Sequence, residues 1–154
     1  MQYWLFKSEP ETFSIDDLAA AAGKTTGWDG VRNYQVRNFM RDVMKRGDSC
    51  FFYHSSCAVP GIAGIVTITR TAYPDPTQFD RKHVHHDPDS KLDAPRWLMV
   101  DVKLQRKLKR IITLDELRKQ QDSHLQEMLL LKRGNRLSIT PVSKHEWQYI
   151  VGME

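Results

Sequence analysis

Apolar residues recur along the chain with two periods, which separate the expected strands from the expected helices. Runs rich in aromatic and β-branched residues, typical of strands, cover residues 2–7, 48–55, 61–73, 96–112 and 136–142. Residues 74–95, between the third and fourth runs, hold four prolines and little periodicity. This composition predicts a long surface loop with room for one helical turn.

Helices are expected where a polar cap precedes an apolar face. Ser14, Thr113 and Ser143 are each followed three positions later by Asp or Glu, which is the spacing of a capping box. In such a box the hydroxyl oxygen accepts a backbone N–H of the first helical turn. A further helix is expected at residues 35–44, where apolar residues gather on one face. Residues 124–131 predict another helix, or the continuation of the one that starts after Thr113.

The expected order of elements is strand, helix, helix, three strands, two helices, strand and helix. Strands and helices do not alternate throughout, so a doubly wound parallel sheet is not expected. Long strands with short helices around them favour an α+β fold, a small barrel of about five to six mixed strands. A length of 154 residues without repeats or a linker fits one domain, residues 1–154.

Composition indicates the cellular compartment in which the protein is expected. The chain is 40% hydrophobic and 27% charged, which is ordinary for a folded domain. No apolar run approaches the roughly 20 residues that span a bilayer, and the first residues lack the basic and apolar regions of a signal peptide. Cys50 and Cys57 match no metal-finger spacing and fit free thiols in a reducing compartment. We therefore expect an intracellular, soluble protein without a membrane partner, cytoplasmic, or nuclear if the source is a eukaryote.

The net charge of +4 is only mildly basic, so the distribution of the cations matters more than their sum. One basic stripe with four-residue spacing begins at Arg37, and basic runs cover residues 103–110 and 132–136. Each is either a solvated face or a surface that contacts phosphates. The residues expected to contact a nucleic-acid backbone are Arg37, Arg41, Lys45, Arg106, Lys107 and Arg136.

Motifs of well-known enzyme classes are absent: the chain has no GxGxxG, GxxxxGK[ST], HExxH or GxSxG string. The string HVHHD at residues 83–87 offers imidazoles and a carboxylate to a metal. It lies in a loop rich in proline and aspartate without regular spacing, which favours a solvated loop. His54 and Cys57 could pair as base and nucleophile, but residues three apart on a strand point to opposite faces. No metal, cofactor or catalytic residue is expected.

The segment GWDGVRNYQVRNFMR concentrates flat and hydrogen-bonding side chains just before a helix. Trp28 lies outside any helical or strand period, and Gly30 allows close approach of the backbone. Asn33 offers a donor and an acceptor, Tyr34 a ring with a hydroxyl, and Arg32 a planar cation. A nucleobase requires such a set. The alternative is a loop that plugs the barrel, with Trp28 in the core.

Polar and aromatic residues also gather at the ends of other expected strands, where small barrels usually bind ligands. The first strand ends in KSEP, the second ends in FYHS, and PRW begins another. Taken alone, His54 is more simply a satisfied buried histidine, and Trp97 a core residue. The coincidence of these clusters favours a ligand site. Its expected lining is Lys7, Ser8, Glu9, Trp28, Arg32, Asn33, Tyr34, Tyr53, His54, Ser55 and Trp97.

Six strings along the chain together resemble the EVE domain family. They are YWLFKSEPETFSIDDL, WDGVRNYQVRNFMR, GDSCFFYHS, PGIAGI, PRWLMVDV and GNRLSITPV. The resemblance covers nearly the whole chain, from Tyr3 to about Ile150. That family is similar to the PUA-like fold and related to the YTH and ASCH domains. The strings KSEP and WDGVRNYQ are specific when they occur together in this order. One departure is Val36, where alanine is expected; it lies on the core face of its helix and affects no functional residue.

The resemblance implies a PUA-like pseudo-barrel with a pocket for a modified base flipped out of its strand. Relatives are associated with 5-methylcytosine and 5-hydroxymethylcytosine in DNA, and YTH relatives with N6-methyladenine in RNA. The full aromatic cage of YTH domains is absent, so their ligand cannot be transferred. The pocket residues implied by the resemblance are Lys7, Ser8, Glu9, Trp28, Asn33, Tyr34, Tyr53, His54 and Ser55.

Three functional hypotheses follow. The favoured one is a monomeric, non-catalytic nucleic-acid-binding module that holds a modified base of DNA or RNA. The alternative is an enzyme acting on a small nucleotide or modified RNA, with His54, Ser8 or Glu9 as acid or base. No second carboxylate or metal set near those motifs supports it. The third is a protein-interaction module that uses the basic face of the helix at residues 35–44.

Overall fold

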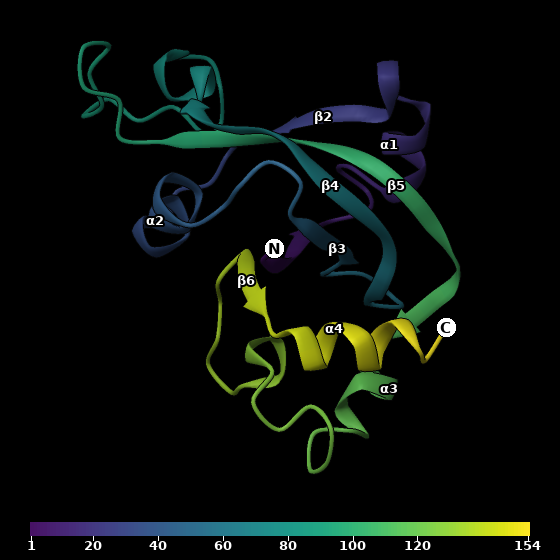
Figure 1. Cartoon of the computed structure of the whole chain (residues 1–154). Coiled ribbons are helices and arrows are strands. Elements are labelled where there is room, and N and C mark those ends of the chain that lie inside the picture. The colour runs from purple at the N-terminus through teal and green to yellow at the C-terminus, as the bar shows by residue number, and fades with distance from the viewer.

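The computed structural model describes residues 1–154 and contains one six-stranded mixed sheet with short helices around it (Figure 1). The strands lie in the order β2-β5-β4-β3-β1-β6. Strand β1 pairs parallel with β3, and the other neighbouring strands are antiparallel. The predicted α+β class is confirmed. The strands are β1 Tyr3–Ser8, β2 Thr25–Trp28, β3 Ser49–His54, β4 Gly61–Pro74, β5 Leu98–Thr113 and β6 Ile139–Val142.

The helices are short and begin at the predicted caps. The hydroxyl oxygens of Ser14, Thr113 and Ser143 each accept the backbone N–H three residues on, and the acidic side chain at that position bonds back to the cap. None of the helices has the length and apolar character needed to cross a membrane. The α-helices are α1 Ile15–Ala20, α2 Tyr34–Asp42, α3 Leu114–Arg118 and α4 Lys144–Val151, and the 3-10 helices are η1 Ala22–Lys24, η2 Pro76–Phe79 and η3 Leu129–Leu131.

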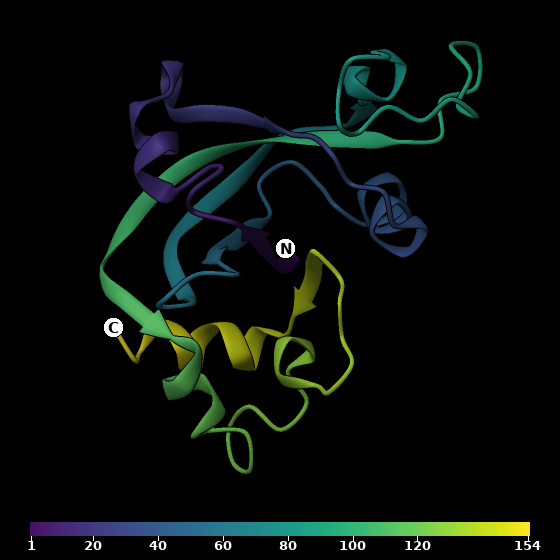
Figure 2. The same ribbon diagram turned by 180° about the vertical axis from the view of Figure 1, so that it is seen from behind.

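The two longest strands, β4 and β5, curve into a band that bends around the rest of the sheet (Figures 1 and 2). Their pairing shifts register at several points, and extra residues at such bulges bend a strand and increase its twist. The curvature brings the edge strand β2 close to β1, so that the rings of Trp28 and Phe6 lie 5.1 Å apart. Helices α3 and α4 lie near the opposite end of the band.

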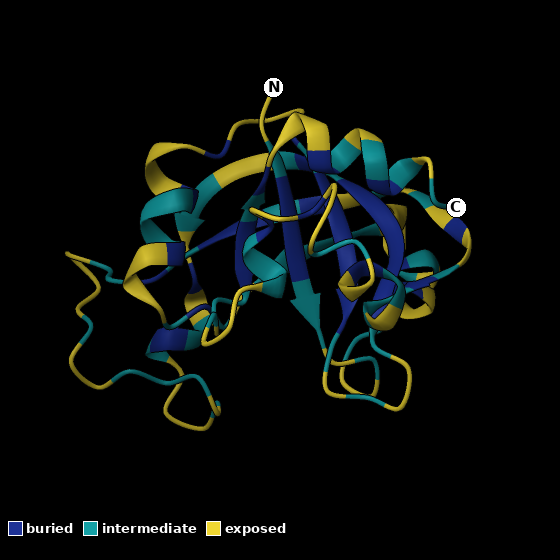
Figure 3. Cartoon of the chain, turned by 90° about the horizontal axis from the view of Figure 1, so that it is seen from below, coloured by how far each residue is buried: buried dark blue, intermediate teal, exposed yellow.

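The core has two parts on opposite faces of β1 and β3. Because neighbouring side chains on a strand point to opposite faces, Phe6 and Phe52 enter one cluster with residues of α1 and α2. Leu5 and Phe51 enter the other cluster with residues of α3 and α4. In Figure 3 the central strands are buried, whereas much of the surrounding helices and loops is exposed. The first cluster contacts Trp28, at the end of β2.

Residues 25–28 form an edge strand that the sequence pattern did not predict. Strand β2 pairs with β5 from Thr25 to Trp28. Its run TTGW is short and contains a glycine, which weakens strand propensity. The interpretation that Trp28 lies outside any strand period is therefore wrong, because its backbone is fixed by the sheet.

The helix expected at residues 124–131 is also wrong. Residues 119–127 form successive turns, followed by the 3-10 helix η3. The side chain of Gln121 donates to the carbonyl of Leu131 at 3.1 Å, and side-chain bonds of this kind compete with a helical ladder. The surface loop predicted at residues 74–95 is confirmed, with η2 as its helical turn.

Replacing Phe52 with alanine should lower the free energy of unfolding by about 3–5 kcal/mol, because it removes a buried ring from the first cluster. Urea unfolding followed by circular dichroism measures this change. Val84→Ala is the control, since Val84 is 87% exposed, and it should change stability by less than about 0.5 kcal/mol. Equal effects of the two substitutions would contradict the assigned core.

Candidate functional site

A cleft of about 530 Å³ lies where the edge strand β2 approaches the end of β1. Its walls include Lys7 and Ser8 of β1, residues 26–28 of β2, and Gly30 from the segment that follows. Two further residues, His85 and Ser138, reach it from loops distant in the sequence. This volume lies within the range of small-molecule sites and is large enough for a single base.

Trp28 forms a rigid wall of the cleft. Its ring meets Phe6 edge-to-face at 5.1 Å and Phe52 at 5.6 Å, with interplanar angles of 77° and 87°. The ring is half-buried, so it packs on the core with one part and lines the cleft with another. The two interpretations of Trp28, core packing and site wall, therefore both describe this side chain.

The KSEP segment lies at the cleft and holds a tight loop. Ser8 Oγ donates to the carbonyl of Phe13 at 2.6 Å, and the carbonyl of Glu9 accepts the N–H of Phe13 at 2.8 Å. The Glu9 carboxylate is exposed at the cleft, and burial lowers the pKa of the Lys7 ammonium group. The first three KSEP residues thus offer both donors and acceptors to an occupant of the cleft.

The FYHS residues lie behind the cleft and do not line it. His54 Nε2 accepts the N–H of Ile15, the first residue of α1, at 3.1 Å, and burial lowers the pKa of its imidazole. Tyr53 packs in the second core cluster, where burial raises its pKa to about 12. Ser55 donates its N–H to the carbonyl of Ser8 at 2.9 Å. These residues therefore support the end of β1 and the start of α1.

Asn33 and Tyr34 also lie outside the residues that line the cleft. Asn33 is the N-cap of α2, and its Oδ1 accepts the N–H of Val36 at 3.1 Å. Tyr34 is 51% exposed and lies against the buried ring of Trp97, with centroids 4.8 Å apart. The side chain of Asn33 is thus used by the backbone, whereas the half-exposed ring of Tyr34 packs against Trp97 and the guanidinium of Arg37.

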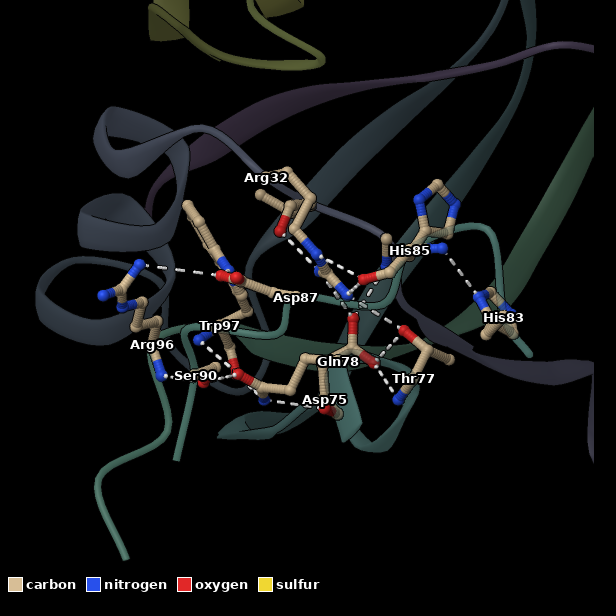
Figure 4. Close-up of polar contacts among 12 residues, drawn as sticks. Arg32, Asp75, Thr77, Gln78, His83, His85, Asp87, Ser90, Arg96 and Trp97 are labelled. Carbon is tan, nitrogen blue, oxygen red and sulfur yellow. Dashed lines mark hydrogen bonds and ion pairs between the residues drawn. The ribbon is translucent and has the colours of Figure 1, made fainter. Parts of the chain in front are cut away.

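Arg32 ties the segment after β2 to the loop that follows β4 (Figure 4). Its guanidinium donates to Asp75 Oδ2 at 3.1 Å and to Thr77 Oγ1 at 3.1 Å. Two of its nitrogens, Nε and Nη2, donate to the carbonyl of His85 at 3.0 and 2.7 Å. A fourth acceptor is the carbonyl of Val31 at 2.8 Å. Through these bonds Arg32 links the segment after β2 to the loop after β4, and it does not line the cleft.

Asp75 is the fully buried partner of Arg32. Its Oδ2 also accepts the N–H of Gly30 at 2.8 Å, and its Oδ1 accepts the N–H and the hydroxyl of Thr77 at 2.8 and 2.6 Å. Burial by itself would raise the pKa of this carboxyl. The bonds from Thr77, Gly30 and Arg32 outweigh it and hold the pKa below its usual range.

Gln78 fixes the other end of the same loop. Its amide nitrogen donates to the carbonyls of Asp75 and Trp97 at 2.7 and 2.8 Å, and its oxygen accepts the N–H of Trp97 at 3.1 Å. Trp97 in turn donates its indole N–H to Asp87 at 2.7 Å (Figure 4). Trp97 is buried in this network and does not line the cleft.

The sequence gives no prediction for Asp75 and Gln78, and its composition favours a solvated loop around His85. The last assignment is wrong, because His85 is half-buried and lines the cleft. Asp75 caps η2 with Pro76 in the first turn, a start signal that was present in the sequence. No local signal marks His85, since its position depends on contacts with Gly30 and Arg32.

Most cations expected to contact a nucleic-acid backbone already have protein partners. The ion pairs are Arg41–Asp42, Arg106–Glu154 and Lys107–Asp16. Arg37 donates to Asn38 and to the carbonyl of Arg96, with its guanidinium 4.8 Å from the ring of Tyr34.

Two of these cations, Lys45 and Arg136, are exposed and form no ion pair. Arg136 lies two residues before Ser138, which lines the cleft and accepts the N–H of Lys7 through its carbonyl at 2.9 Å. Of the two, Arg136 is thus the one that is close in sequence to a cleft residue.

The fold and the cleft define a small α+β domain with a cleft that Trp28 lines. The model of the EVE domain family matches residues 2–153. Human thymocyte nuclear protein 1 is 48% identical, over 99% of this chain and 73% of the human protein. The chain belongs to the EVE domain family.

Solved structures agree with this assignment. A crystal structure of human THYN1 protein in complex with 5-methylcytosine-containing DNA has a TM-score of 0.95 to this chain at 47% identity, covering 99% of this chain and 97% of that chain. A Pseudomonas putida protein has a TM-score of 0.92 at 48% identity, covering 98% of both chains. The six-stranded mixed sheet is thus the fold of these relatives.

Replacing Asp75 with asparagine should lower the free energy of unfolding at pH 7 by about 2–3 kcal/mol, because Arg32 loses its buried anionic partner. The folded-state pKa of Asp75 lies below its usual value, so its stabilising effect is complete above about pH 4. That effect is lost as the pH falls through the folded-state pKa. The difference between wild type and variant should therefore shrink below about pH 4.

Urea unfolding of both proteins at pH 7 and near pH 3 measures the two differences. The other carboxylates are common to both chains, so the comparison isolates Asp75. An unchanged difference at both pH values would contradict the ionised state of this carboxyl.

Proposed function

We propose that this chain is a non-catalytic DNA-binding module that holds a base, 5-methylcytosine or one similarly modified, in the cleft against Trp28. The observation that carries the proposal is the Trp28 ring, which Phe6 and Phe52 fix at the wall of the cleft. The human relative crystallised with 5-methylcytosine-containing DNA, at a TM-score of 0.95, supports DNA as the partner. RNA with a modified base is the competing ligand in the binding test.

The energies of base extrusion set what the cleft must supply. Taking a base out of a duplex costs a few kcal/mol, and packing it on an aromatic ring returns about 1–3 kcal/mol. Phosphate contacts must therefore provide much of the net affinity, and they weaken as salt rises. Burying the extra methyl group of 5-methylcytosine contributes about 0.8 kcal/mol, roughly a fourfold preference. We expect a modest preference for the methyl group by itself.

The surroundings of the residues considered for catalysis favour a binding role. His54 Nε2 is occupied by the N–H of Ile15, and Ser8 Oγ donates to the carbonyl of Phe13. Glu9 is exposed, without a buried acid or base as partner. An acid–base reaction needs groups within hydrogen-bonding reach of the reacting atoms. We therefore expect the protein to turn over no member of a panel of nucleosides and modified RNA.

The proposed cellular compartment follows from DNA as the ligand. Animal relatives carry the name thymocyte nuclear protein 1, which agrees with work on DNA in the nucleus if the source is a eukaryote. In a source without a nucleus the cytoplasm is the expected compartment. A monomer is sufficient, because the cleft is built from one chain.

Replacing Arg136 with glutamine should weaken binding to every strand by a similar factor and reduce the slope of log affinity against log salt by about 0.7–0.9. The reason is that Arg136 is exposed, forms no ion pair and lies two residues before the cleft residue Ser138, so it is free to contact a phosphate. Arg106→Gln is the control, because Arg106 is already paired with Glu154. Titrations at several salt concentrations measure both slopes, and an equal effect of the two variants would exclude a special role for Arg136.

Replacing Trp28 with alanine should reduce affinity for the modified strand by about 5- to 150-fold and erase its preference, because the base loses its stacking partner. The experiment titrates matched DNA and RNA strands that carry cytosine, 5-methylcytosine, 5-hydroxymethylcytosine, adenine or N6-methyladenine. Trp28→Phe keeps a ring at this position and should retain part of the preference.

Trp147→Ala is the matched control for lost stability. Its ring stacks on Phe51 at 3.9 Å, outside the cleft, so this variant should lose stability while keeping its strand preference. If wild type binds all strands alike, or if Trp28→Ala keeps the preference, the proposed function is wrong.

A further inference from the structure

The loop around His83–Asp87 brings one imidazole, that of His85, into the cleft. His85 is half-buried and lines the cleft beside Gly30. A Cβ atom added at Gly30 would lie 2.7 Å from His85 Nε2, so the ring packs directly on a backbone that has no side chain. Neither ring nitrogen of His85 has a hydrogen-bond partner within the protein, whereas His83 Nδ1 accepts the N–H of His85 at 3.0 Å.

The backbone of His85 is fixed by hydrogen bonds on both its carbonyl and its N–H. Its carbonyl accepts two bonds from Arg32, and its N–H is bound to His83. Arg32 is itself fixed by the buried Asp75 and by Thr77. Figure 4 shows the His85 ring pointing away from this network. The network therefore positions a side chain whose polar atoms remain free for an occupant of the cleft.

The chemistry of the ligand defines what a free imidazole can add. 5-Methylcytosine and thymine both carry a methyl group at C5, so an apolar wall such as Trp28 cannot tell them apart. They differ at C4, where cytosine has an amino donor and thymine a carbonyl acceptor. A neutral imidazole has one acceptor and one donor nitrogen. With the acceptor towards C4 it bonds with the amino group of cytosine, whereas thymine needs the N–H there, and therefore the other tautomer or a turned ring.

We propose that His85 is a specificity-determining residue, whose ring nitrogen accepts a hydrogen bond from the amino group of the bound cytosine and so favours cytosine over thymine. This inference rests on the proposed function. The carboxylates of Glu9 and Asp29 also lie at the cleft, but both residues are exposed, and water competes there for the amino group. His85 is less exposed and has its backbone fixed, which makes it the better reader of that position.

The test measures the affinities of wild type and variants for matched single strands with 5-methylcytosine, cytosine or thymine at one position. Single strands avoid differences in base pairing. His85→Phe keeps a ring against Gly30 but removes both nitrogens. It should bind 5-methylcytosine about fivefold more weakly, leave thymine binding unchanged or improved, and so reduce the preference by at least fivefold. His86→Phe, on the neighbouring residue that does not line this cleft, should keep all three affinities.

The outcomes separate the two proposals. If wild type binds the three strands equally, the proposed function fails irrespective of His85. If wild type prefers 5-methylcytosine and His85→Phe rejects thymine as strongly as before, His85 does not read the base, while base binding stands. If His85→Phe weakens all three strands by one factor, His85 only shapes the cleft, and the assignment is overturned.

Arg32 is the positioning residue in this arrangement, and a double-variant comparison tests it. Lysine keeps the charge of Arg32 but cannot donate to Asp75, Thr77 and the His85 carbonyl with one planar group. Arg32→Lys should reduce the preference for 5-methylcytosine over thymine in wild type and have little further effect on it in the His85→Phe background. Equal effects in both backgrounds would show that Arg32 does not act through His85. Thermal unfolding of each variant confirms that folded proteins are compared.

Discussion

The cleft depends on one buried carboxylate. Asp75 accepts hydrogen bonds from Gly30, Arg32 and Thr77, and by doing so joins the segment after β2 to the loop after β4. A buried ionised group is costly unless it is fully bonded, so this arrangement is stable only when all its partners are in place. Both loop segments are therefore fixed together. The wall of the cleft formed by Trp28 and Gly30 therefore has a fixed position relative to the wall formed by His85.

The sheet supplies the other half of the site. Curvature of β4 and β5 brings the edge strand β2 close to β1, and the alternation along β1 and β3 directs Phe6 and Phe52 towards Trp28. Aromatic packing then fixes a ring that still lines the cleft. An apolar wall fixed in this way can accept many flat ligands, so selectivity must come from polar groups at defined positions. The cleft therefore combines an apolar wall, Trp28, with a loop after β4 whose hydrogen bonds fix its polar groups.

Local signals in the sequence predicted local structure. The capping boxes at Ser14, Thr113 and Ser143 fixed three helix starts, because cap and partner lie three residues apart. Strand β2 and the turns at residues 119–127 were not predicted, since pairing with β5 and side-chain bonds to the backbone decide them. For the site, the KSE cluster and Trp28 do meet at one cleft, and their contact with a ligand stays a prediction. Five other residues have the chemistry of ligand groups, but their side chains or backbones bond or pack within the protein instead: Arg32, Asn33, Tyr53, His54 and Trp97.

The decisive experiment for base binding in the cleft is a crystal structure of this chain with a 5-methylcytosine-containing DNA. We expect the methylated base to lie outside the DNA stack, in the cleft, with its ring on Trp28 and its amino group facing His85. A structure in which the methylated base stays stacked in the DNA, or in which the DNA lies on another face of the domain, would contradict this expectation.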